Sequence, residues 1–467
     1  MKFHLVTLGC QMNMSDSERV KAFLTSQGFV WTDQEEDAFL LGILSCSVRQ
    51  KSIDKVYSRI AKWNKWKKKK NLLTFATACI LPADKEKFLK SFDFVFPVTE
   101  LHLFPDMIRQ YGVVSPLSLQ HEQKIQQKQS NQSVFIEAKA ETNKGFSPTP
   151  DKEIELFWDL TPSYDSEFEA FVPIQNGCDK FCTFCAVPYT RGREVSRPSM
   201  EILEEVRSLI EKGYKSITLL GQNVNSYGLD KKGDEISFPE LLRQIGKMGE
   251  SSSKDFWVYF TSPHPRDMSE EVIEVIAQYN CLAKQIHLPV QSGDNAVLKR
   301  MNRKHTVESF ENTVRIIREK LHEATIFTDI IVGFSGETDE EFENTRLLME
   351  RSAFNMAYIA MYSPRPGAVS AKWDDDVPHH KKKERLHILS EVLRKHSLQY
   401  NKGLIGKKMK VLVSGNDRKA AYLSAYTEGR IVTRFPSDDA SLIGQFAEVE
   451  IISASELSIE AKLLHIK

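Results

Sequence analysis

The hydrophobic pattern of the amino-terminal region alternates short apolar runs with amphipathic stretches. The apolar runs, each of strand length, stand at residues 2–8, 38–44 and 72–76. Helical periodicity follows the first run up to Gly28 and follows the second run over residues 52–65. We expect the first helix to open at the capping box Ser15-x-x-Glu18 and to stop at Gly28. Strands that alternate with helices form parallel sheets, so this region predicts a parallel α/β domain.

The same alternation resumes at residue 171. Six candidate strands stand at residues 171–175, 216–220, 256–261, 285–288, 326–332 and 356–362. Amphipathic helices interleave them at residues 199–212, 239–248, 269–278, 306–321 and 339–351. Six strands are too few for an eight-fold barrel and predict a partial (β/α)6 barrel. In barrels of this type the chemistry gathers at the carboxyl ends of the strands.

The carboxyl-terminal region changes pattern again, after a basic helix over residues 379–400. Short β-rich segments follow at residues 408–414, 421–427, 429–434, 445–452 and 457–461. They predict a small antiparallel barrel, a fold that often binds RNA, although a structural appendage is the alternative. The expected domains are an α/β domain (1–114), a Gln-rich connection (115–165), the partial barrel with its following helix (166–400) and the small β-barrel (401–467).

Charge and length narrow the function classes. The 467 residues contain 63 Lys and Arg against 63 Asp and Glu, so a nucleic-acid partner must be met by a local basic patch. One candidate patch is the run from Lys62 to Lys70, where Trp63 and Trp66 interleave the lysines; a solvated helix end is the alternative. We find no signal-peptide pattern and no apolar run near the ~20 residues of a membrane span, which predicts a cytoplasmic protein.

Three of the seven cysteines follow the three amino-terminal strands. Cys10, Cys46 and Cys79 each stand just beyond the carboxyl end of one predicted strand. These ends converge in an open parallel sheet, so the three thiols are expected to meet at a ligand site. Three buried structural cysteines are the alternative, because free cysteine is often buried. Cys281 is left over without a role.

The other three cysteines share one loop, with the spacing Cys178-x3-Cys182-x2-Cys185. No histidine lies between Phe171 and Met200, so the loop cannot complete a four-ligand zinc site locally; a zinc knuckle that borrows a distant ligand such as Cys281 is the alternative. A [4Fe-4S] cluster held by three thiolates keeps one iron open, as a catalytic site requires. This spacing resembles that of the radical S-adenosylmethionine (SAM) enzymes, in which the open iron chelates SAM.

Polar and glycine-rich segments after the barrel strands are candidates for SAM contacts. Phe184 resembles the aromatic that shields cluster and adenine in that superfamily. Small or neutral hydrogen-bonding residues that could hold the amino group, ribose, carboxylate and adenine are Gly221, Gln222, Asn223, Gln291, Ser292, Gly333 and Gly336. Ordinary βα turns are the alternative for each. Glu337, in the last of these segments, is expected to be a helix amino-terminal charge.

Five motifs together resemble the radical SAM methylthiotransferases. They are Gly9-Cys10-Gln11-Met12-Asn13, Ser45-Cys46-Ser47-Val48-Arg49, the loop from Gly177 to Arg197, Leu219 to Asn225 and His287 to Gly293. The resemblance is nearest to the branch that adds a methylthio group to isopentenylated adenosine beside the anticodon of tRNA. The carboxyl-terminal segment resembles the TRAM domain of that branch. The chain departs from the family pattern at Leu44-Ser45, around Cys79 and at Ser335.

The resemblance implies two [4Fe-4S] clusters and SAM as cofactors. It makes Cys178, Cys182 and Cys185 ligands of the SAM-cleaving cluster, and Cys10, Cys46 and Cys79 ligands of an auxiliary cluster that presents sulfur. It also implies a tRNA anticodon loop as substrate, a cellular electron donor and a monomer. Alternatives are a methylthiotransferase of threonylcarbamoyladenosine tRNA or of a ribosomal protein and, from another class, a non-catalytic iron-sulfur RNA-binding protein.

Overall fold

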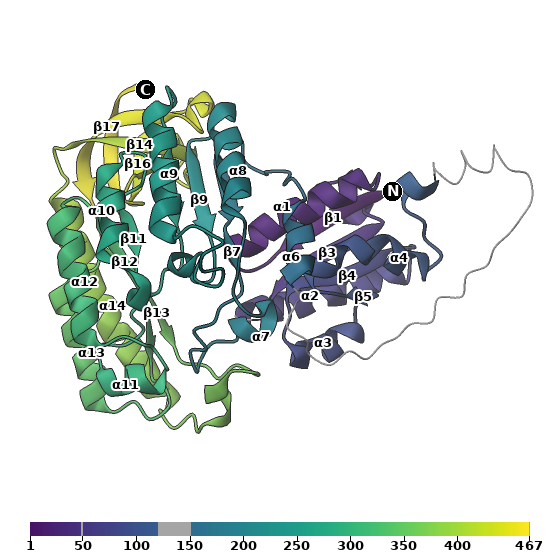
Figure 1. Cartoon of the computed structure of the whole chain (residues 1–467), viewed down its shortest axis with the longest axis horizontal. Helices are drawn as coiled ribbons and strands as arrows, with labels where there is room; N and C mark the ends of the chain where they lie inside the picture. Colours follow the sequence, from purple (N-terminus) through teal and green to yellow (C-terminus); the bar gives the residue numbers. More distant parts are fainter. Residues whose placement is uncertain (48–49, 120–150, 467) are drawn as a thin grey trace, which may run out of the picture. The chain divides into compact units, whose positions relative to one another are not determined.

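The computed structural model describes residues 1–47, 50–119 and 151–466, which form two compact units (Figure 1). Val48, Arg49 and most of the predicted Gln-rich connection lie outside the described residues. The first unit holds Met1–Asp165, Asn176–Asp179 and Ala186–Val195. The second unit holds Ser166–Gln175, Lys180–Cys185 and Ser196–Lys467. The segment that contains the loop cysteines therefore contributes to both units, with Cys178 in the first and Cys182 and Cys185 in the second.

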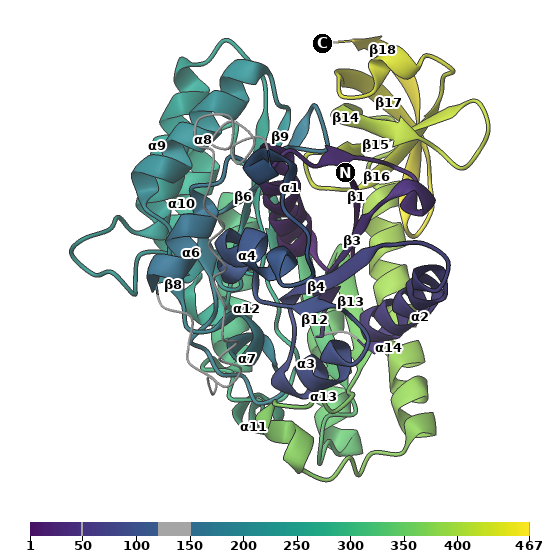
Figure 2. The ribbon, with the colours of Figure 1, turned by 90° about the vertical axis from the view of Figure 1, so that its right-hand side faces the viewer.

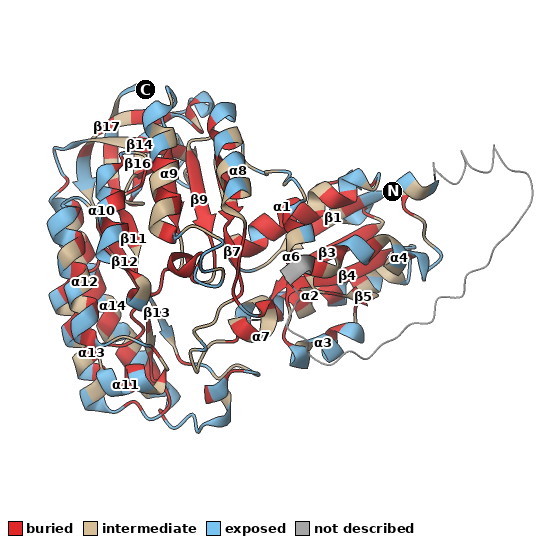
Figure 3. Cartoon of the chain, viewed as in Figure 1, coloured by how far each residue is buried: buried red, intermediate tan, exposed pale blue. Residues whose placement is uncertain are grey.

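The first unit is built on a five-stranded parallel sheet in the order β2-β1-β3-β4-β5. Its strands are β1 (Lys2–Thr7), β2 (Val30–Trp31), β3 (Leu40–Cys46), β4 (Leu73–Cys79) and β5 (Phe94–Val95). Every residue of β3 and β4 is buried, and Figure 3 shows both strands in red. The continuous apolar runs in the sequence have this cause, because a central parallel strand is covered on both faces.

Helices cover both faces of this sheet. On one face α1 (Gln11–Ser26) packs Val20, Phe23 and Leu24 against β1 and β3. On the other face α2 (Gln50–Lys67) packs Ile53, Val56 and neighbouring apolar residues, and Figure 2 shows the two helices flanking the sheet. The remaining helices are η1 (Glu35–Asp37), α3 (Pro82–Leu89), η2 (Val98–Leu103), α4 (Phe104–Arg109), α6 (Asp151–Trp158) and α7 (Val187–Arg191).

The predicted capping box at Ser15 is wrong. The helix begins at Gln11 with Cys10 at its N-cap, and Ser15 lies one turn inside it. The Ser15 hydroxyl accepts a hydrogen bond from the buried Arg19 guanidinium at 2.9 Å, so it does not cap the helix. The earlier start matters because it places the thiol of Cys10 at the positive end of the helix dipole.

The second unit contains six parallel strands divided between two three-stranded sheets. The first sheet has the order β10-β9-β6 and the second the order β11-β12-β13. The strands are β6 (Glu169–Pro173), β9 (Ser216–Leu220), β10 (Trp257–Phe260), β11 (Gln285–His287), β12 (Thr325–Val332) and β13 (Met356–Met361). An isolated bridge between Val258 and Leu282 spans the gap between the sheets. The prediction of six barrel strands is confirmed.

The helices of the second unit cover the outer surface of these strands. Ile326, Thr328 and Ile330 of β12 are at most 1% exposed, whereas Asp329 and Ile331, which point to the opposite face, are partly exposed. This alternation is that of a half-barrel with a packed outside and an accessible inner wall. The helices are α8 (Ser199–Lys212), η3 (Val224–Ser226), α9 (Phe238–Ser251), η4 (Pro265–Asp267), α10 (Glu270–Gln278), α11 (Asn295–Arg300), α12 (Val307–Lys320), α13 (Asp339–Ser352), η5 (Val369–Lys372) and α14 (His379–Lys402).

A closed five-stranded barrel completes the second unit, with the order β14-β15-β16-β18-β17 (Figure 2). Its elements are β14 (Lys408–Asn416), β15 (Tyr422–Thr427), β16 (Val432–Pro436), η6 (Ala440–Leu442), β17 (Phe446–Ala454) and β18 (Ser458–Ile466). The prediction of an antiparallel barrel is wrong in one place, because β16 pairs with β18 in parallel. Two short strands, β7 (Gln175–Asn176) and β8 (Val195–Ser196), flank the cysteine loop in the sequence.

The turn from Glu428 to Arg430, between β15 and β16, ties this barrel to the amino-terminal ends of the half-barrel strands. The Arg430 guanidinium lies 4.0 Å from the ring of Tyr259 and 4.1 Å from the ring of Tyr426, and it donates to Ser216 Oγ at 3.1 Å. Thr325 Oγ1 donates to the Gly429 carbonyl at 2.7 Å. The turn therefore closes the end of the half-barrel opposite to the rim where chemistry is expected.

Candidate cluster and cofactor sites

The first three cysteines meet at one edge of the amino-terminal sheet. Cys46 and Cys79 are the last residues of β3 and β4 and are register partners across the parallel pair. Cys10 follows β1 and caps α1. Asn13 lies beside two of the thiols, with its Oδ1 3.6 Å from Cys79 Sγ and 3.8 Å from Cys10 Sγ. The prediction that sequence-distant cysteines converge here is consistent with this geometry.

Backbone and side-chain hydrogen bonds hold this edge in place. Asn13 Nδ2 donates to the Leu8 carbonyl at 2.8 Å and to the Ser45 carbonyl at 2.7 Å, which ties the ends of β1 and β3 together. Gly9 has φ +128°, and a Cβ there would stand 2.8 Å from Cys46 Cβ and 2.9 Å from Asn13 Nδ2. Position 9 therefore accepts only glycine without displacing the site.

An arginine from α7 reaches the same edge. Arg191 Nε donates to Cys79 Sγ at 3.0 Å, and Arg191 Nη2 pairs with Asp16 at 2.6 Å. Burial raises the pKa of Cys79 to about 12 and the Arg191 charge opposes that rise. Cys46 and Cys79 are buried, whereas Cys10 is exposed. The site thus has two sheltered thiols, one accessible thiol and one fixed cation.

The loop cysteines are held by different means in the two units. In the first unit Gly177 has φ +77°, and a Cβ there would stand 1.9 Å from the Arg193 carbonyl oxygen. The Cys178 amide donates to the Gly192 carbonyl at 3.3 Å. Asp179 accepts from Arg193 at 2.6 and 2.9 Å. Close backbone packing therefore fixes the chain around Cys178.

In the second unit the segment from Arg300 to Arg303 holds residues 180–185. Thr183 Oγ1 donates to the Arg300 carbonyl at 2.9 Å, and Asn302 Nδ2 donates to the Phe181 carbonyl at 2.9 Å. Arg303 places Nη1 3.5 Å from Cys182 Sγ, and its Nη2 donates to the Pro289 carbonyl at 2.5 Å. Cys182 and Cys185 are partly exposed and lie on one turn, because the Cys185 amide donates to the Cys182 carbonyl at 3.0 Å.

The rim segments after the half-barrel strands carry buried polar atoms that lack a hydrogen-bond partner among the described residues. After β9 these atoms are Gln222 Oε1 and Asn223 Oδ1. After β10 and β12 they are His264 Nε2 and Ser335 Oγ. A buried unpaired polar atom costs about 1–3 kcal/mol, so several of them along one rim indicate a site built for a polar ligand.

The remaining predicted rim residues have these positions. Gly333 and Gly336 have φ +69° and +74°, whereas Gly221 is not in the left-handed region and its missing Cβ leaves room for Gln175. Gln291 is buried at φ +77°. The Ser292 hydroxyl lies 3.2 Å from Thr345 Oγ1, so that hydroxyl is already engaged within the rim.

Glu337 and Phe184 make structural contacts next to the rim segments. Glu337 is buried, accepts from the Gly333 amide at 2.9 Å and pairs with the buried Arg385 at 2.7 Å. It is thus a structural anchor and not a free helix-end charge. Phe184, which directly precedes Cys185 in the sequence, packs its ring against Met301, Phe334 and other apolar residues.

Cys281 and the lysine run have structural explanations. Cys281 packs in the second unit with Sγ 3.9 Å from the Gly246 carbonyl oxygen, and burial raises its pKa to about 11. Lys62 pairs with Glu35, and both Lys62 and Lys70 lie over the Trp66 ring, at 4.6 and 4.9 Å. The lysine charges are thus partly compensated by η1, as expected of a helix end.

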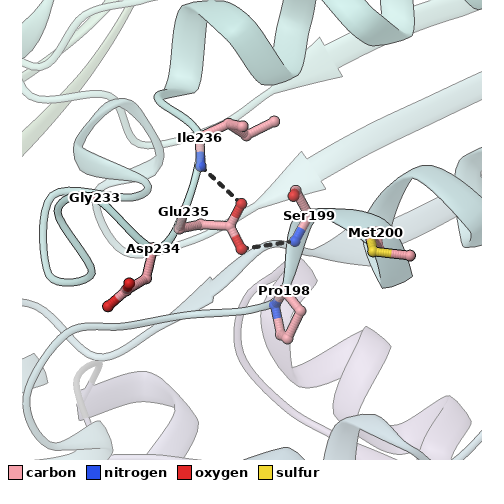
Figure 4. A pocket seen from close by; sticks show the side chains of 7 residues that line it. All are labelled: Pro198, Ser199, Met200, Gly233, Asp234, Glu235 and Ile236. Carbon is pink, nitrogen blue, oxygen red and sulfur yellow. Dashed lines mark hydrogen bonds between the residues drawn. The ribbon is translucent and has the colours of Figure 1, made fainter.

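A separate hollow lies at the start of α8 (Figure 4). It is lined by Pro198, Ser199, Met200, Gly233, Asp234, Glu235 and Ile236. Glu235 accepts from the Ser199 amide at 3.0 Å and from its neighbouring Ile236 amide at 2.8 Å, so its carboxylate caps the helix. None of the predicted cofactor residues lines this hollow.

Family comparisons cover almost the whole chain. Residues 172–349 match the radical SAM superfamily, residues 2–98 match the Uncharacterized protein family UPF0004 and residues 402–464 match the TRAM domain. The tRNA-2-methylthio-N(6)-dimethylallyladenosine synthases of Oceanobacillus iheyensis and Treponema denticola are 36% and 35% identical to the chain. Each alignment covers 99% of this chain, and 84% and 100% of the respective relative.

The chain belongs to the radical SAM methylthiotransferases. Its relatives place it in their tRNA-2-methylthio-N(6)-dimethylallyladenosine synthase branch, so the expected family is confirmed. Among solved structures, the cobalamin-dependent SAM radical enzyme OxsB has a TM-score of 0.50 at 13% identity, covering 84% of this chain and 56% of OxsB. That likeness shows the fold alone. A methylthiotransferase of this superfamily uses SAM and a [4Fe-4S] cluster.

The residues present fit these cofactors. No three His, Cys, Asp or Glu side chains of the described residues stand closely enough to hold a single metal ion. A four-iron cluster is larger than one ion and takes thiolates that stand further apart, as three sulfur ligands around its corners. The unpaired polar atoms of the methylthiotransferase rim offer hydrogen bonds to a ligand as polar as SAM.

Several residues at these sites carried no assigned role in the sequence. Arg191 and Asn13 stood inside quoted motifs, but their contacts join residues more than sixty positions apart. Arg303 lies between α11 and α12, and α11 itself has no signal in the alternation of strands and helices. A basic residue next to a cysteine-binding loop in space can be found only after folding.

The TRAM barrel has a buried apolar interior. Its Arg430 is only partly buried, with 25% of the side chain exposed, and lies against the rings of Tyr259 and Tyr426. Within the residues that the structure describes, no helix has both the length and the apolar character needed to cross a bilayer.

Proposed function

We propose that the chain adds a methylthio group to carbon 2 of N6-isopentenyladenosine next to the anticodon of tRNA, using a second, auxiliary [4Fe-4S] cluster as sulfur donor. The synthases named above are similar over 99% of this chain, which supports this substrate over threonylcarbamoyladenosine tRNA or a ribosomal protein. The observation that carries the proposal is the proximity of Cys79 to both other cysteines: Cys46 is its register partner, and Asn13 Oδ1 lies near the thiols of Cys79 and Cys10.

The two cysteine sets have separate roles in this proposal. Cys178, Cys182 and Cys185 hold the cluster that opens SAM, and Cys10, Cys46 and Cys79 hold the auxiliary cluster. When bound, SAM and the clusters supply a radical that removes hydrogen from the adenine and supply the sulfur and methyl of the new group. The residues proposed to hold SAM are Phe184, Gly221, Gln222, Asn223, Gln291, Ser292, Gly333 and Gly336.

In this proposal the protein's own residues hold the cofactors and seal the site around them. The rim offers unpaired oxygens at Gln222 and Asn223 and a ring nitrogen at His264 to the cofactor. Burial, together with the charge of Arg303, lowers the pKa of His264 far below its ordinary value, so its imidazole is neutral and binds without adding charge. The target base must leave its stack to reach the rim, as bases of single-stranded loops can.

The domain roles follow. The auxiliary site belongs to the α/β domain (1–114), SAM cleavage to the partial barrel (166–400) and RNA binding to the barrel of residues 401–467. We expect a cytoplasmic monomer that takes its electron from a cellular donor.

The test uses full-length chain reconstituted with iron and sulfide under anaerobic conditions. Cys182→Ala is expected to abolish 5′-deoxyadenosine formation from SAM. Cys10→Ala should retain SAM cleavage and lose methylthiolation of tRNA, measured by nucleoside mass analysis. Cys281→Ser, which changes a packed thiol outside both sites, is the matched control and should retain both activities.

Equal loss of SAM cleavage in Cys182→Ala and Cys10→Ala would refute the division of labour. A parent protein that holds iron but yields no 5′-deoxyadenosine would favour the rival reading as an iron-sulfur RNA-binding protein. Nucleosides from a deletion strain then show whether the tRNA modification depends on this chain in the cell.

A further inference from the structure

Arg191 is a buried cation at the auxiliary cysteine edge, and every one of its side-chain nitrogens has a partner. Its Nε donates to Cys79 Sγ at 3.0 Å, and its Nη1 donates to Asn176 Oδ1 at 3.2 Å. Its Nη2 donates to Asp16 at 2.6 Å and to Asn13 Oδ1 at 3.1 Å. The Arg191 side chain is only 6% exposed and that of Asp16 only 4%. All these residues belong to the first unit.

The local fold gives the guanidinium one orientation. Arg191 is the last residue of the short helix α7, and Gly192 at φ +79° turns the chain away directly after it. Asn176 is used twice, because its Nδ2 also donates to the Arg191 carbonyl at 2.9 Å. Asn13 is shared in the same way between the thiols and Arg191. The side chain is therefore held at both ends by residues that belong to the site.

Stability alone does not explain this arrangement. A buried ion pair costs more desolvation than an apolar pair of the same volume, and its replacement by apolar residues is often neutral or stabilising. Arg191 also directs one of its five donors at a sulfur, although sulfur is a weak acceptor beside the oxygens nearby. The geometry is that of a group placed for the thiolate.

A donor and a positive charge at a cluster sulfur have a known physical effect. Hydrogen bonds to the sulfurs and the local net charge set the reduction potential of an iron-sulfur cluster. A cation stabilises the reduced cluster, which carries one more negative charge, and thus raises the potential. A carboxylate such as Asp16 opposes it. Cys79 is buried, so water screens neither charge well.

We propose that Arg191 is a positioning residue that raises the reduction potential of the cluster held by Cys10, Cys46 and Cys79, and that Asp16 offsets this effect. This rests on the auxiliary cluster of the proposed function. Arg191 lies six residues after Cys185 in the sequence, so the segment that follows the SAM-cluster loop supplies the charge that tunes the other cluster. Arg191 touches no substrate in this proposal and acts through Cys79.

The test isolates the auxiliary cluster in the full chain. Cys178, Cys182 and Cys185 are all changed to Ala, so that reconstituted protein should hold about four irons. The midpoint potential of that cluster is then measured by redox titration followed by electron paramagnetic resonance. Arg191→Lys, Arg191→Met and Asp16→Asn are introduced into this background.

The expected shifts have opposite signs. Arg191→Met should lower the midpoint potential most, because it removes both the charge and the N–H donor to Cys79. Arg191→Lys keeps the charge without the planar fork and should lower the potential less. Asp16→Asn removes the opposing negative charge and should raise the potential. The matched control is Arg193→Lys, which changes an exposed arginine two residues away that pairs with Asp179, and it should leave the potential unchanged.

The sign difference between Arg191→Lys and Asp16→Asn decides the outcome, even where Arg191→Met binds less iron. A structural role would change iron content or stability without moving the two potentials in opposite directions. Equal potentials in both variants, or shifts of the same sign, would overturn the proposal. Absence of iron from the parent with native Arg191 would instead refute the auxiliary cluster itself, so the two failures are distinguishable.

Discussion

The two cysteine sets of this chain are assembled in opposite ways. Cys178, Cys182 and Cys185 lie within eight residues of one another, whereas Cys10, Cys46 and Cys79 come from the ends of three strands. Each set has one arginine that donates to one of its sulfurs, Arg303 to Cys182 and Arg191 to Cys79. The loop set depends on local backbone conformation, and the sheet set depends on the register of a whole domain.

This difference predicts that the two cysteine sets respond differently to substitutions. A local change should impair the set beside it more than the other set, because the two sets share no cysteine and only Arg191 reaches from the loop segment to the Cys79 edge.

Gly177→Ala should abolish SAM cleavage. The new Cβ would stand 1.9 Å from the Arg193 carbonyl oxygen at a φ of +77°, so the backbone before Cys178 must move. We expect the iron content to fall from about eight to about four per chain while the auxiliary cluster remains. Iron analysis and the 5′-deoxyadenosine yield measure both effects. Gly233→Ala is the control, since its added Cβ meets nothing within 4 Å at a similar φ of +92°. Full iron content in Gly177→Ala would contradict the prediction.

Gly9→Ala should produce the converse result. Its Cβ would stand 2.8 Å from Cys46 Cβ and 2.9 Å from Asn13 Nδ2, which displaces both Cys46 and the residue that contacts the thiols of Cys10 and Cys79. We expect methylthiolation of tRNA to fall at least about tenfold, equivalent to about 1.4 kcal/mol, with SAM cleavage retained. The two products are measured in one reaction. A parallel loss of both products would show that the sets are not separable.

Arg303→Met should slow SAM cleavage about tenfold, roughly 1.4 kcal/mol in the barrier. The variant removes a donor 3.5 Å from Cys182 Sγ and a hydrogen bond to the Pro289 carbonyl. Single-turnover formation of 5′-deoxyadenosine measures the rate, and Arg315→Met, an exposed arginine on α12 that pairs with Glu319, is the control. An unchanged rate would mean that the loop cluster needs no counterpart of Arg191.

Acid should destabilise the second unit before the first. Burial, together with the charge of Arg303, lowers the pKa of His305 to about 3, and neither of its ring nitrogens has a partner among the described residues. The unfolded chain binds this proton near pH 6.5, so stability is full above that pH and is lost as the pH falls toward 3. The cost at pH 5 is about 2 kcal/mol.

Hydrogen exchange at pH 7.5 and pH 5 measures this difference in α12, which follows His305 directly. His305→Phe should reduce the acid effect, and His387→Gln, which changes an exposed histidine on α14, should not. Equal exchange of α12 at both pH values would contradict the prediction.

Much of this architecture could be predicted from the sequence because its signals are local. The six half-barrel strands follow from apolar runs, and α8 has the predicted bounds, Ser199 to Lys212. Strands β3 and β4 continue past their predicted ends to Cys46 and Cys79, because the polar Ser45 and Thr77 are buried and continue the ladder. The parallel pairing of β16 with β18 is a long-range choice with no local signal.

The candidate site residues likewise divide into those with a local sequence signal and those that depend on long-range contacts. The spacing of Cys178, Cys182 and Cys185 predicts a cluster loop from a local signal, and the strand-end positions of the other three cysteines predict their meeting. Arg191 could not be assigned, because its partners Asp16 and Cys79 lie far away in the sequence and only folding reveals them. The prediction of a capping box at Ser15 was wrong because the same residue pattern also occurs inside helices.

The turn from Glu428 to Arg430 bears on how the proposed RNA substrate would be positioned at the half-barrel. Arg430 lies against the rings of Tyr259 in the half-barrel and Tyr426 in the small barrel, so it joins these two parts of the second unit. If the small barrel binds the RNA, as proposed above, this junction would set the distance between the bound RNA and the proposed SAM rim. Which nucleotide is modified would then follow from the distance between grip and rim along the RNA, and a longer or shorter anticodon arm would present the wrong base.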